Sequence, residues 1–353
     1  MDHFELLKKL SEQFGVSGFE EEVRSWISGT IRDSVDEIET DTLGNLIARI
    51  NPGRDLTVML DAHMDEIGLM VSYIEESGLM RFATIGGWDS RILPAQQVEI
   101  RSRHGKRHRG VIGAAPPHIQ TAEEQKQVLR VEDLFVDIGV RSKEELVALG
   151  IGPGCPGNIS YPFHRIGTDR VMGKALDDRV GCAVLIRCME HFFGNRPDFT
   201  LVANFATCEE VGLRGATTAA RQIQPDVAFV IEGTVAADTP GTPAHKCPSR
   251  LGLGPAITVA DKSILVNPSL LSRIEEIAGE LKIPWQHKVP LTGSTDAGAI
   301  HLTGKGVLTG IISVPCRYIH SASSILDLND FELTVSLVIG ILQRAREIKR
   351  STS

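Results

Sequence analysis

The chain is poor in residues that several classes of protein depend on. Only 5% of it is aromatic, with three Trp and three Tyr, which leaves little material for the stacking platforms of a sugar cleft. Its six cysteines include no CxxC pair, which argues against a disulfide framework and predicts reduced, mostly buried thiols. No apolar run approaches the length of a membrane span, and the first residues lack the features of a signal peptide. These absences predict a cytoplasmic protein with no membrane partner.

The remaining composition is ordinary for a globular protein. The 353 residues are 42% hydrophobic and 23% charged, which permits one large domain or two modest ones around a sizeable core. The formal net charge of -8 disfavours nucleic acid as a partner, because an acidic surface is repelled by phosphate.

Residues 1–67 and 164–353 alternate short apolar runs with amphipathic segments. Residues 56–60 are typical of a buried strand, whereas residues 183–193 and 331–348 have the spacing of helices. Buried strands that alternate with helices predict an α/β fold, with a mostly parallel sheet covered by helices on both faces. We expect the two parts to form one discontinuous domain.

The intervening residues, 68–163, differ in character. Short β-like runs alternate with turn-rich segments, and only residues 142–149 have a helical pattern. This pattern predicts a small inserted domain that resembles a β-barrel. Its segment 101–109 is strongly basic and could bind an anion, but a solvated hairpin centred on Gly105 is the better interpretation.

Two adjacent carboxylates end one of the predicted buried strands. Residues 201–208 form an apolar and β-branched run that stops at Glu209, Glu210 and Gly212. Such a pair is costly at the end of a buried strand unless a cation lies between the carboxylates. Neighbouring side chains of an extended chain point to opposite sides. One glutamate can therefore hold a metal while the other acts as a free base.

Further polar side chains stand at the ends of other predicted strands, where sites form in open α/β sheets. They are His63, Asp65, Glu232 and His320, with Asp177 and Asp178 just before a helix. Two histidines with several carboxylates suit zinc or another divalent transition metal. Any one of these residues is more often structural, but their coincidence at strand ends predicts a two-metal hydrolytic site that shares a bridging carboxylate.

These polar segments resemble the tetrahedral (TET-type) aminopeptidases, also called glutamyl aminopeptidases or "cellulase M", among the co-catalytic metallopeptidases. The similarity covers essentially the whole chain, inserted domain included. It is carried by five motifs: Asp61-Ala-His-Met-Asp-Glu-Ile-Gly68, Lys174-Ala-Leu-Asp-Asp-Arg-Val-Gly181, Cys208-Glu-Glu-Val-Gly-Leu-Arg-Gly215, Asp238-Thr-Pro-Gly241 and Arg317-Tyr-Ile-His-Ser321.

The resemblance implies an aminopeptidase that acts on short peptides with two divalent metal ions per subunit, Zn²⁺ or Co²⁺. It implies that Asp177 bridges the two ions. His63 and Glu232 would complete one metal site, and Glu210 and His320 would complete the other.

The resemblance also implies catalytic and assembly roles. Glu209 would be the general base that takes a proton from water and passes it to the leaving amine. Asp65 would orient His63. The inserted domain, residues 68–163, would mediate dimerisation, and the dimers would assemble into a hollow tetrahedral dodecamer.

Two positions depart from the family pattern. Position 232 is Glu where many members carry Asp, and the longer side chain predicts a shifted metal position or an altered affinity. After His320 the chain continues Ser321-Ala-Ser-Ser, without the Pro and Glu often found there.

In related enzymes the peptide bond after the bridging Asp is cis, and we predict the same for Asp177–Asp178.

Two other functions fit parts of the sequence. An endo-glucanase, the activity in the name "cellulase", needs two carboxylates that flank a sugar and no metal, which leaves His63 and His320 without a role. A catalytically silent assembly protein of the same fold would need no base, and the complete ligand set together with Glu209 argues against it.

Overall fold

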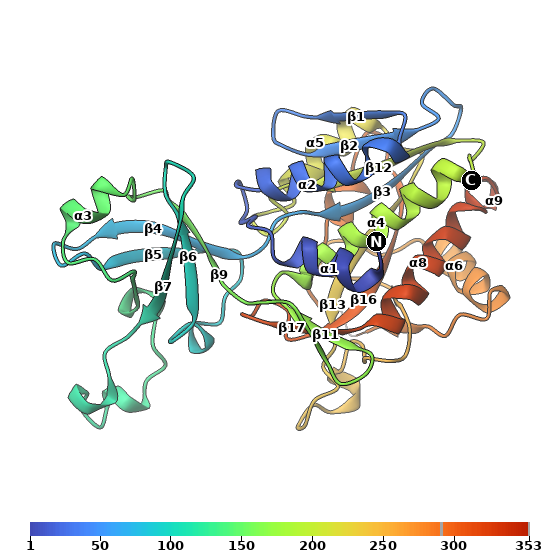
Figure 1. The fold of residues 1–353 in the computed structure, drawn as a ribbon. Helices are drawn as coiled ribbons and strands as arrows, with labels where there is room; N and C mark the ends of the chain where they lie inside the picture. Colours follow the sequence, from blue (N-terminus) through green and yellow to red (C-terminus); the bar gives the residue numbers. More distant parts are fainter. Residues whose placement is uncertain (290–291, 352–353) are drawn as a thin grey trace.

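The computed structural model describes residues 1–289 and 292–351, and its centre is a four-stranded parallel arrangement (Figure 1). In spatial order the four strands are β12 (Thr200–Ala206), β3 (Thr57–His63), β13 (Val227–Val235) and β16 (Leu308–Arg317). Antiparallel strands extend both edges of this sheet. They are β2 (Leu46–Ile50) and β1 (Glu37–Thr40) beside β12, and β17 (Ser324–Asp327), β11 (Arg170–Gly173) and β10 (His164–Ile166) beside β16. Two short strands, β14 (Ala256–Thr258) and β15 (Gln286–Lys288), pair with each other, and β14 also pairs with β16.

Successive side chains of the central strands enter two separate hydrophobic layers. On β3, Val58 and Leu60 pack with α4 (Leu176–Gly194), whereas Met59 packs with α5 (Arg214–Ile223). Since side chains alternate along a strand, an unbroken apolar run buries both faces of the sheet. The predicted α/β class is thus confirmed, with a sheet that is parallel at its centre and mixed towards its edges.

The helices divide between the two faces. The α4 layer also holds α1 (His3–Ser11), α2 (Glu21–Ile31), α6 (Pro268–Glu280), α8 (Leu328–Leu342) and α9 (Ala345–Ser351), and the opposite layer holds α5 and α7 (Ala297–Ile300). The predicted closing helix 331–348 is two helices, α8 and α9, and no Gly or Pro explains the interruption at Gln343 and Arg344. Short 3₁₀ helices are η1 (Arg32–Ser34), η2 (Ser90–Ile92), η3 (Pro117–Ile119), η4 (Glu124–Lys126), η5 (Val131–Asp133) and η6 (Ala244–Lys246). No helix in the described residues is both long and apolar enough to cross a membrane.

The inserted part of the chain forms a closed six-stranded barrel beside the sheet (Figure 1). Its order is β4 (Gly68–Ile74), β5 (Met80–Ile85), β8 (Phe135–Asp137), β7 (Arg107–Gly113), β6 (Gln97–Arg101) and β9 (Pro156–Ile159). The barrel has its own hydrophobic core, and α3 (Lys143–Ala148) matches the helix predicted there. The β-barrel-like architecture is confirmed, while the domain boundaries and the dimerisation role stay predictions.

The basic segment 101–109 is the hairpin between β6 and β7, and it turns at Gly105 with a φ of 78°. Its arginines pair with acids of α2: Arg101 lies 3.2 Å from Glu21, and Arg107 pairs with Glu22. The hairpin interpretation is therefore correct, and the charges join the barrel to α2.

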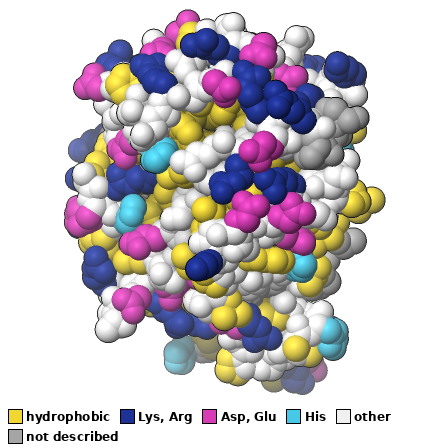
Figure 2. All heavy atoms as spheres, turned by 90° about the vertical axis from the view of Figure 1, so that its right-hand side faces the viewer, with side chains coloured by type: hydrophobic (Ala, Val, Ile, Leu, Met, Phe, Trp, Pro, Cys, Tyr) yellow, Lys and Arg dark blue, Asp and Glu magenta, His cyan; other side chains and the backbone are white. Residues whose placement is uncertain are grey.

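Charges of the two signs are also interspersed on the face that Figure 2 shows. On α6, Arg273 forms ion pairs with Glu276 (2.9 Å) and Glu347 (2.7 Å). Arg346 of α9 lies 2.7 Å from Asp55.

A buried ion cluster lies where α1, β3 and α4 meet. The Lys174 ammonium donates to both carboxylate oxygens of Glu66, at 2.7 and 2.8 Å, and to the Gln13 carbonyl at 2.7 Å. The fully buried Arg179 donates to Glu66 at 3.4 Å and to the Met64 carbonyl at 2.7 Å. The cluster thus fixes the segment that follows β3, which continues into the barrel.

Candidate metal centre

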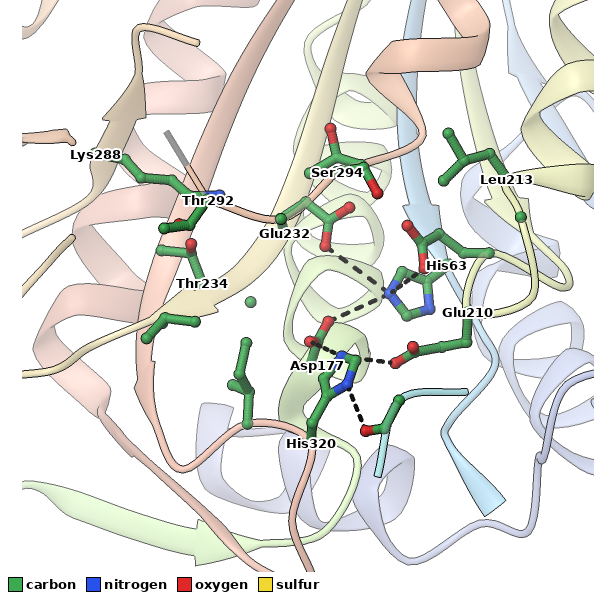
Figure 3. A pocket seen from close by; sticks show the side chains of 18 residues that line it. His63, Asp177, Glu210, Leu213, Glu232, Thr234, Lys288, Thr292, Ser294 and His320 are labelled. Atoms are coloured by element: carbon green, nitrogen blue, oxygen red, sulfur yellow. Dashed lines mark hydrogen bonds and ion pairs between the residues drawn. The ribbon is translucent and has the colours of Figure 1, made fainter. Parts of the chain in front are cut away.

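Six of the seven predicted site residues line one cavity of about 350 Å³ at the carboxyl ends of the central strands. His63 ends β3, Glu232 lies in β13, and Asp177 stands at the start of α4. The other three occupy the turns after β12 and β16: Glu209, Glu210 and His320. Figure 3 shows side chains from these separate elements converging. Asp65, the seventh residue, is fully buried and does not line the cavity.

Asp177 lies between the two histidines (Figure 3). Its Oδ1 is 3.3 Å from Nε2 of His63, and its Oδ2 is 3.5 Å from Nε2 of His320. The Asp177–Asp178 peptide bond is cis, as predicted. A carboxylate that presents one oxygen to each ring has the arrangement that a bridging ligand requires.

Backbone carbonyls face the other nitrogen of each ring. Nδ1 of His63 lies 3.1 Å from the Asp65 carbonyl oxygen, and Nδ1 of His320 lies 2.9 Å from the Gly87 carbonyl oxygen. A proton on each Nδ1 satisfies these carbonyls and leaves the Nε2 lone pair free to bind a metal. Gly87 belongs to the segment between β5 and β6, so the inserted part of the chain supports a ring of the site.

The remaining carboxylates surround the two rings. Oε2 of Glu232 is 3.9 Å and Oε2 of Glu209 is 4.0 Å from Nε2 of His63. On the other side, Oε1 of Glu210 is 3.3 Å from Nε2 of His320. Among the described residues, His63, Asp177 and Glu210 bring ligand atoms close enough together to hold one ion.

Asp178 forms a second group of possible metal ligands together with His63 and Glu232. The sequence predicted no role for Asp178. Its carboxylate accepts hydrogen bonds from the backbone N–H of His63 at 3.2 Å and of Gly181 at 3.0 Å. These bonds tie β3 to α4. The Asp-Asp pair in the sequence was the signal for a second carboxylate at this position.

The electrostatics of the cluster suit a cation. Burial raises the pKa of Glu209 to about 7 and that of Glu210 to about 8, and it raises the pKa of Glu232 well above its usual value. Burial alone would lower the pKa of His63, but Asp177 and Asp65 raise it well above its usual range. Crowded carboxylates that resist ionisation, together with imidazoles directed at them, form a donor set that fits divalent metal.

Asp65 holds the turn that carries the paired glutamates. Its Oδ1 accepts the N–H of Glu209 at 3.0 Å, and its Oδ2 accepts the N–H of Glu210 at 3.2 Å and the hydroxyl of Ser17 at 2.6 Å. Asp65 Oδ1 also lies 3.4 Å from Nδ1 of His63. It therefore contacts both the predicted base and a predicted ligand.

Other residues of the cavity wall were not predicted individually. Lys288 and Gly87 line it, and no motif in the sequence marks either of them. The loop 292–298 contributes Thr292–Thr295 to the wall, whereas the loop 239–253 contributes no lining residue in the described part of the chain.

A metal-ligand cluster at the carboxyl edge of an α/β sheet, with an inserted barrel, defines a hydrolase with a metal centre. The family model described as M42 glutamyl aminopeptidase matches residues 44–337. The chain belongs to this family of metal-dependent enzymes and is an aminopeptidase that hydrolyses peptide bonds.

Relatives and solved structures agree over nearly the whole chain. The lysyl aminopeptidase of Pyrococcus furiosus is 34% identical and is aligned over 98% of each chain. The crystal structure of a TET aminopeptidase from a marine sediment Thaumarchaeota archaeon is similar with a TM-score of 0.96, 36% identity, and coverage of 99% of this chain and 98% of that one. The TET1 peptidase of Pyrococcus horikoshii, which can assemble into a tetrahedron or a large octahedral shell, gives a TM-score of 0.87 and 35% identity, and covers 96% and 98%.

Proposed function

We propose that this chain is a di-metal aminopeptidase that removes N-terminal residues from short peptides. The observation that carries the proposal is the position of Asp177 between Nε2 of His63 and Nε2 of His320. A carboxylate shared by two separate imidazoles favours two ions over one.

The proposed ligands fall into two sets that share Asp177. His63 and Glu232 would complete one set, and Glu210 and His320 the other. Nitrogen and carboxylate donors in this ratio suit Zn²⁺ or Co²⁺. When bound, the two ions would supply the Lewis acidity that lowers the pKa of water and polarises a substrate carbonyl.

Glu209 is proposed as the general base. Its carboxylate lines the cavity beside the ligand cluster, and its backbone N–H donates a hydrogen bond to Oδ1 of Asp65 at 3.0 Å. From this position Glu209 would accept a proton from the attacking water and deliver it to the nitrogen of the departing amine. Asp65 would keep the turn and the His63 ring in place during both transfers.

We also propose the assembly and location of the protein. Dimers would form through residues 68–163 and combine into a tetrahedral dodecamer. The P. horikoshii TET1 peptidase, which can assemble into a tetrahedron, supports the tetrahedral assembly. A cytoplasmic location agrees with the six cysteines, all of which are free.

Metal removal tests the proposed chemistry. Protein treated with chelator should lose hydrolysis of aminoacyl and short-peptide substrates, because the ligand cluster then lacks the ions that activate water. Added Zn²⁺ or Co²⁺ should restore the activity, and metal analysis should give two ions per subunit. Carboxymethyl-cellulose in the same assay serves as the alternative substrate. Chelator-resistant cleavage of cellulose with inert peptides would reject the aminopeptidase.

The variant Asp65→Asn tests the supporting role of Asp65. The amide keeps the size of the side chain but loses the charge that accepts two backbone N–H groups and the Ser17 hydroxyl. We expect a loss of about 10- to 100-fold in metal affinity or activity. Metal titration and kcat measure the two effects. Unchanged values in a folded variant would show that Asp65 does not support the site.

A further inference from the structure

One wall of the cavity carries a lysine that the proposed chemistry does not use. Lys288 ends β15, is 5% exposed and lines the cavity. Lys288 pairs in parallel register with Thr258 of β14, and this pairing fixes the backbone position of Lys288. Figure 3 shows Lys288 on the opposite wall from His63 and His320.

The ammonium of Lys288 has no carboxylate within 4.0 Å and forms no hydrogen bond within residues 1–289 and 292–351. Thr292 lines the same cavity, and its Oγ1 is buried without a hydrogen-bond partner in the described structure. A Lys side chain that is 5% exposed and lacks a counter-charge favours an anion beside it, and a buried hydroxyl without a partner is costly. An anion that entered the cavity would satisfy both groups.

We propose that Lys288 and Thr292 form a carboxylate-binding subsite for the peptide substrate. This inference rests on the proposed aminopeptidase function. A peptide that presents its first carbonyl to the ligand cluster extends its other groups into the rest of the cavity. Lys288 is the sole Lys or Arg among the described residues that line it. Two sources supply the carboxylate: the side chain of an N-terminal Asp or Glu, or the C-terminus of a dipeptide.

The charges of the two walls give the subsite its selectivity. The ligand wall is acidic, with Asp177, Glu209, Glu210 and Glu232, whereas the opposite wall holds one ammonium. A substrate carboxylate would gain a charge-assisted hydrogen bond from Lys288. A neutral group leaves the ammonium unpaired, and a basic group adds like-charge repulsion.

The test compares metal-loaded protein on four substrates. Leucyl coumarin amide and Leu-Leu-amide carry no carboxylate, glutamyl coumarin amide carries only the side-chain carboxylate, and Leu-Leu carries only the C-terminal one. Lys288→Met should lower kcat/KM about 10- to 100-fold for one or both carboxylate substrates and less than about twofold for the others. Lys288→Arg should retain the preference, and Thr292→Val should reduce it about 2- to 10-fold.

The matched control is Lys262→Met. Lys262 is exposed, and its backbone N–H donates a hydrogen bond to the carbonyl of Gly293, in the loop that holds Thr292. The substitution keeps this bond. It should leave all four rates unchanged. Metal content and thermal melting identify a misfolded variant. If Lys288→Met is misfolded, the four substrates are compared with Thr292→Val instead.

Each outcome of the test has one meaning. A loss confined to glutamyl coumarin amide assigns the subsite to an acidic N-terminal side chain, and a loss confined to Leu-Leu assigns it to the C-terminal carboxylate. An equal change on all four substrates, or no change, overturns the subsite while hydrolysis itself continues. Wild-type protein that cleaves none of the four with metal present rejects the proposed function instead.

Discussion

Replacement of Glu209 by Gln is expected to lower kcat by about 10²- to 10⁴-fold. Gln has nearly the same shape as Glu but cannot accept a proton from water at neutral pH. The carboxylate of Glu209 lines the cavity, and its backbone position is set by Asp65, which the substitution leaves intact. Steady-state kinetics on a leucyl substrate, with metal content measured on the same sample, provide the test.

The adjacent residue is the matched control. Glu210 lies 3.3 Å from Nε2 of His320 and is proposed as a ligand, so Glu210→Gln should reduce bound metal and recover part of its activity at high metal concentration. Glu209→Gln should retain its metal and gain nothing from added ions. If the two variants exchange these behaviours, the roles of base and ligand have been assigned to the wrong residues.

The site was predictable because sheet topology brings strand ends together. Once segments such as residues 56–60 and 201–208 were interpreted as buried strands of one mostly parallel sheet, the polar residues that follow its strands were expected at one edge. His63, Glu209 and Glu232 reach the cavity for this reason. The strand pattern gave a location, whereas the specific roles came from the family resemblance and stay proposals.

The groups that support the site could not be predicted in the same way. The Gly87 carbonyl accepts from His320 across 233 positions of the chain, and a backbone carbonyl carries no sequence signal. Asp65 was expected beside His63, but its hydrogen bonds to the backbone of Glu209 and Glu210 depend on how the turn folds. Lys288 is one of many lysines, and only its burial in the tertiary structure distinguishes it.

The fold shows the same division between local pattern and tertiary pairing. Apolar runs such as residues 56–60 and 201–208 predicted strands of the parallel centre, because strands buried on both faces have continuous apolar sequences. The antiparallel edges, such as β10 with β11, have weaker patterns because they are partly exposed. Closure of the barrel depends on the pairing of β4 with β9, two strands more than 80 residues apart, which periodicity does not reveal.

Replacement of Glu66 by Gln is expected to destabilise the protein by about 3–5 kcal/mol, because breaking a buried ion pair leaves an uncompensated charge. Glu66 is 4% exposed and accepts hydrogen bonds from Lys174 and Arg179. Burial already lowers the pKa of Lys174 to about 8, so Lys174 can lose its proton and thereby remove one of the unpaired charges. Arg179 cannot do so, since a guanidinium stays charged. Urea unfolding of metal-loaded protein measures the change.

Two further variants separate charge burial from the loss of a contact. Glu76→Gln removes an exposed carboxylate 3.0 Å from Lys143 and should have little effect, because water screens that pair. Lys174→Met in the Glu66→Gln background removes one of the two unpaired charges and should recover part of the lost stability. A double variant no more stable than Glu66→Gln alone would mean that the hydrogen bonds of Glu66 to Gly15 and Asn158 outweigh the charges. The junction between the sheet and the barrel would then depend on the Glu66 carboxylate as a hydrogen-bond acceptor rather than as a counter-charge.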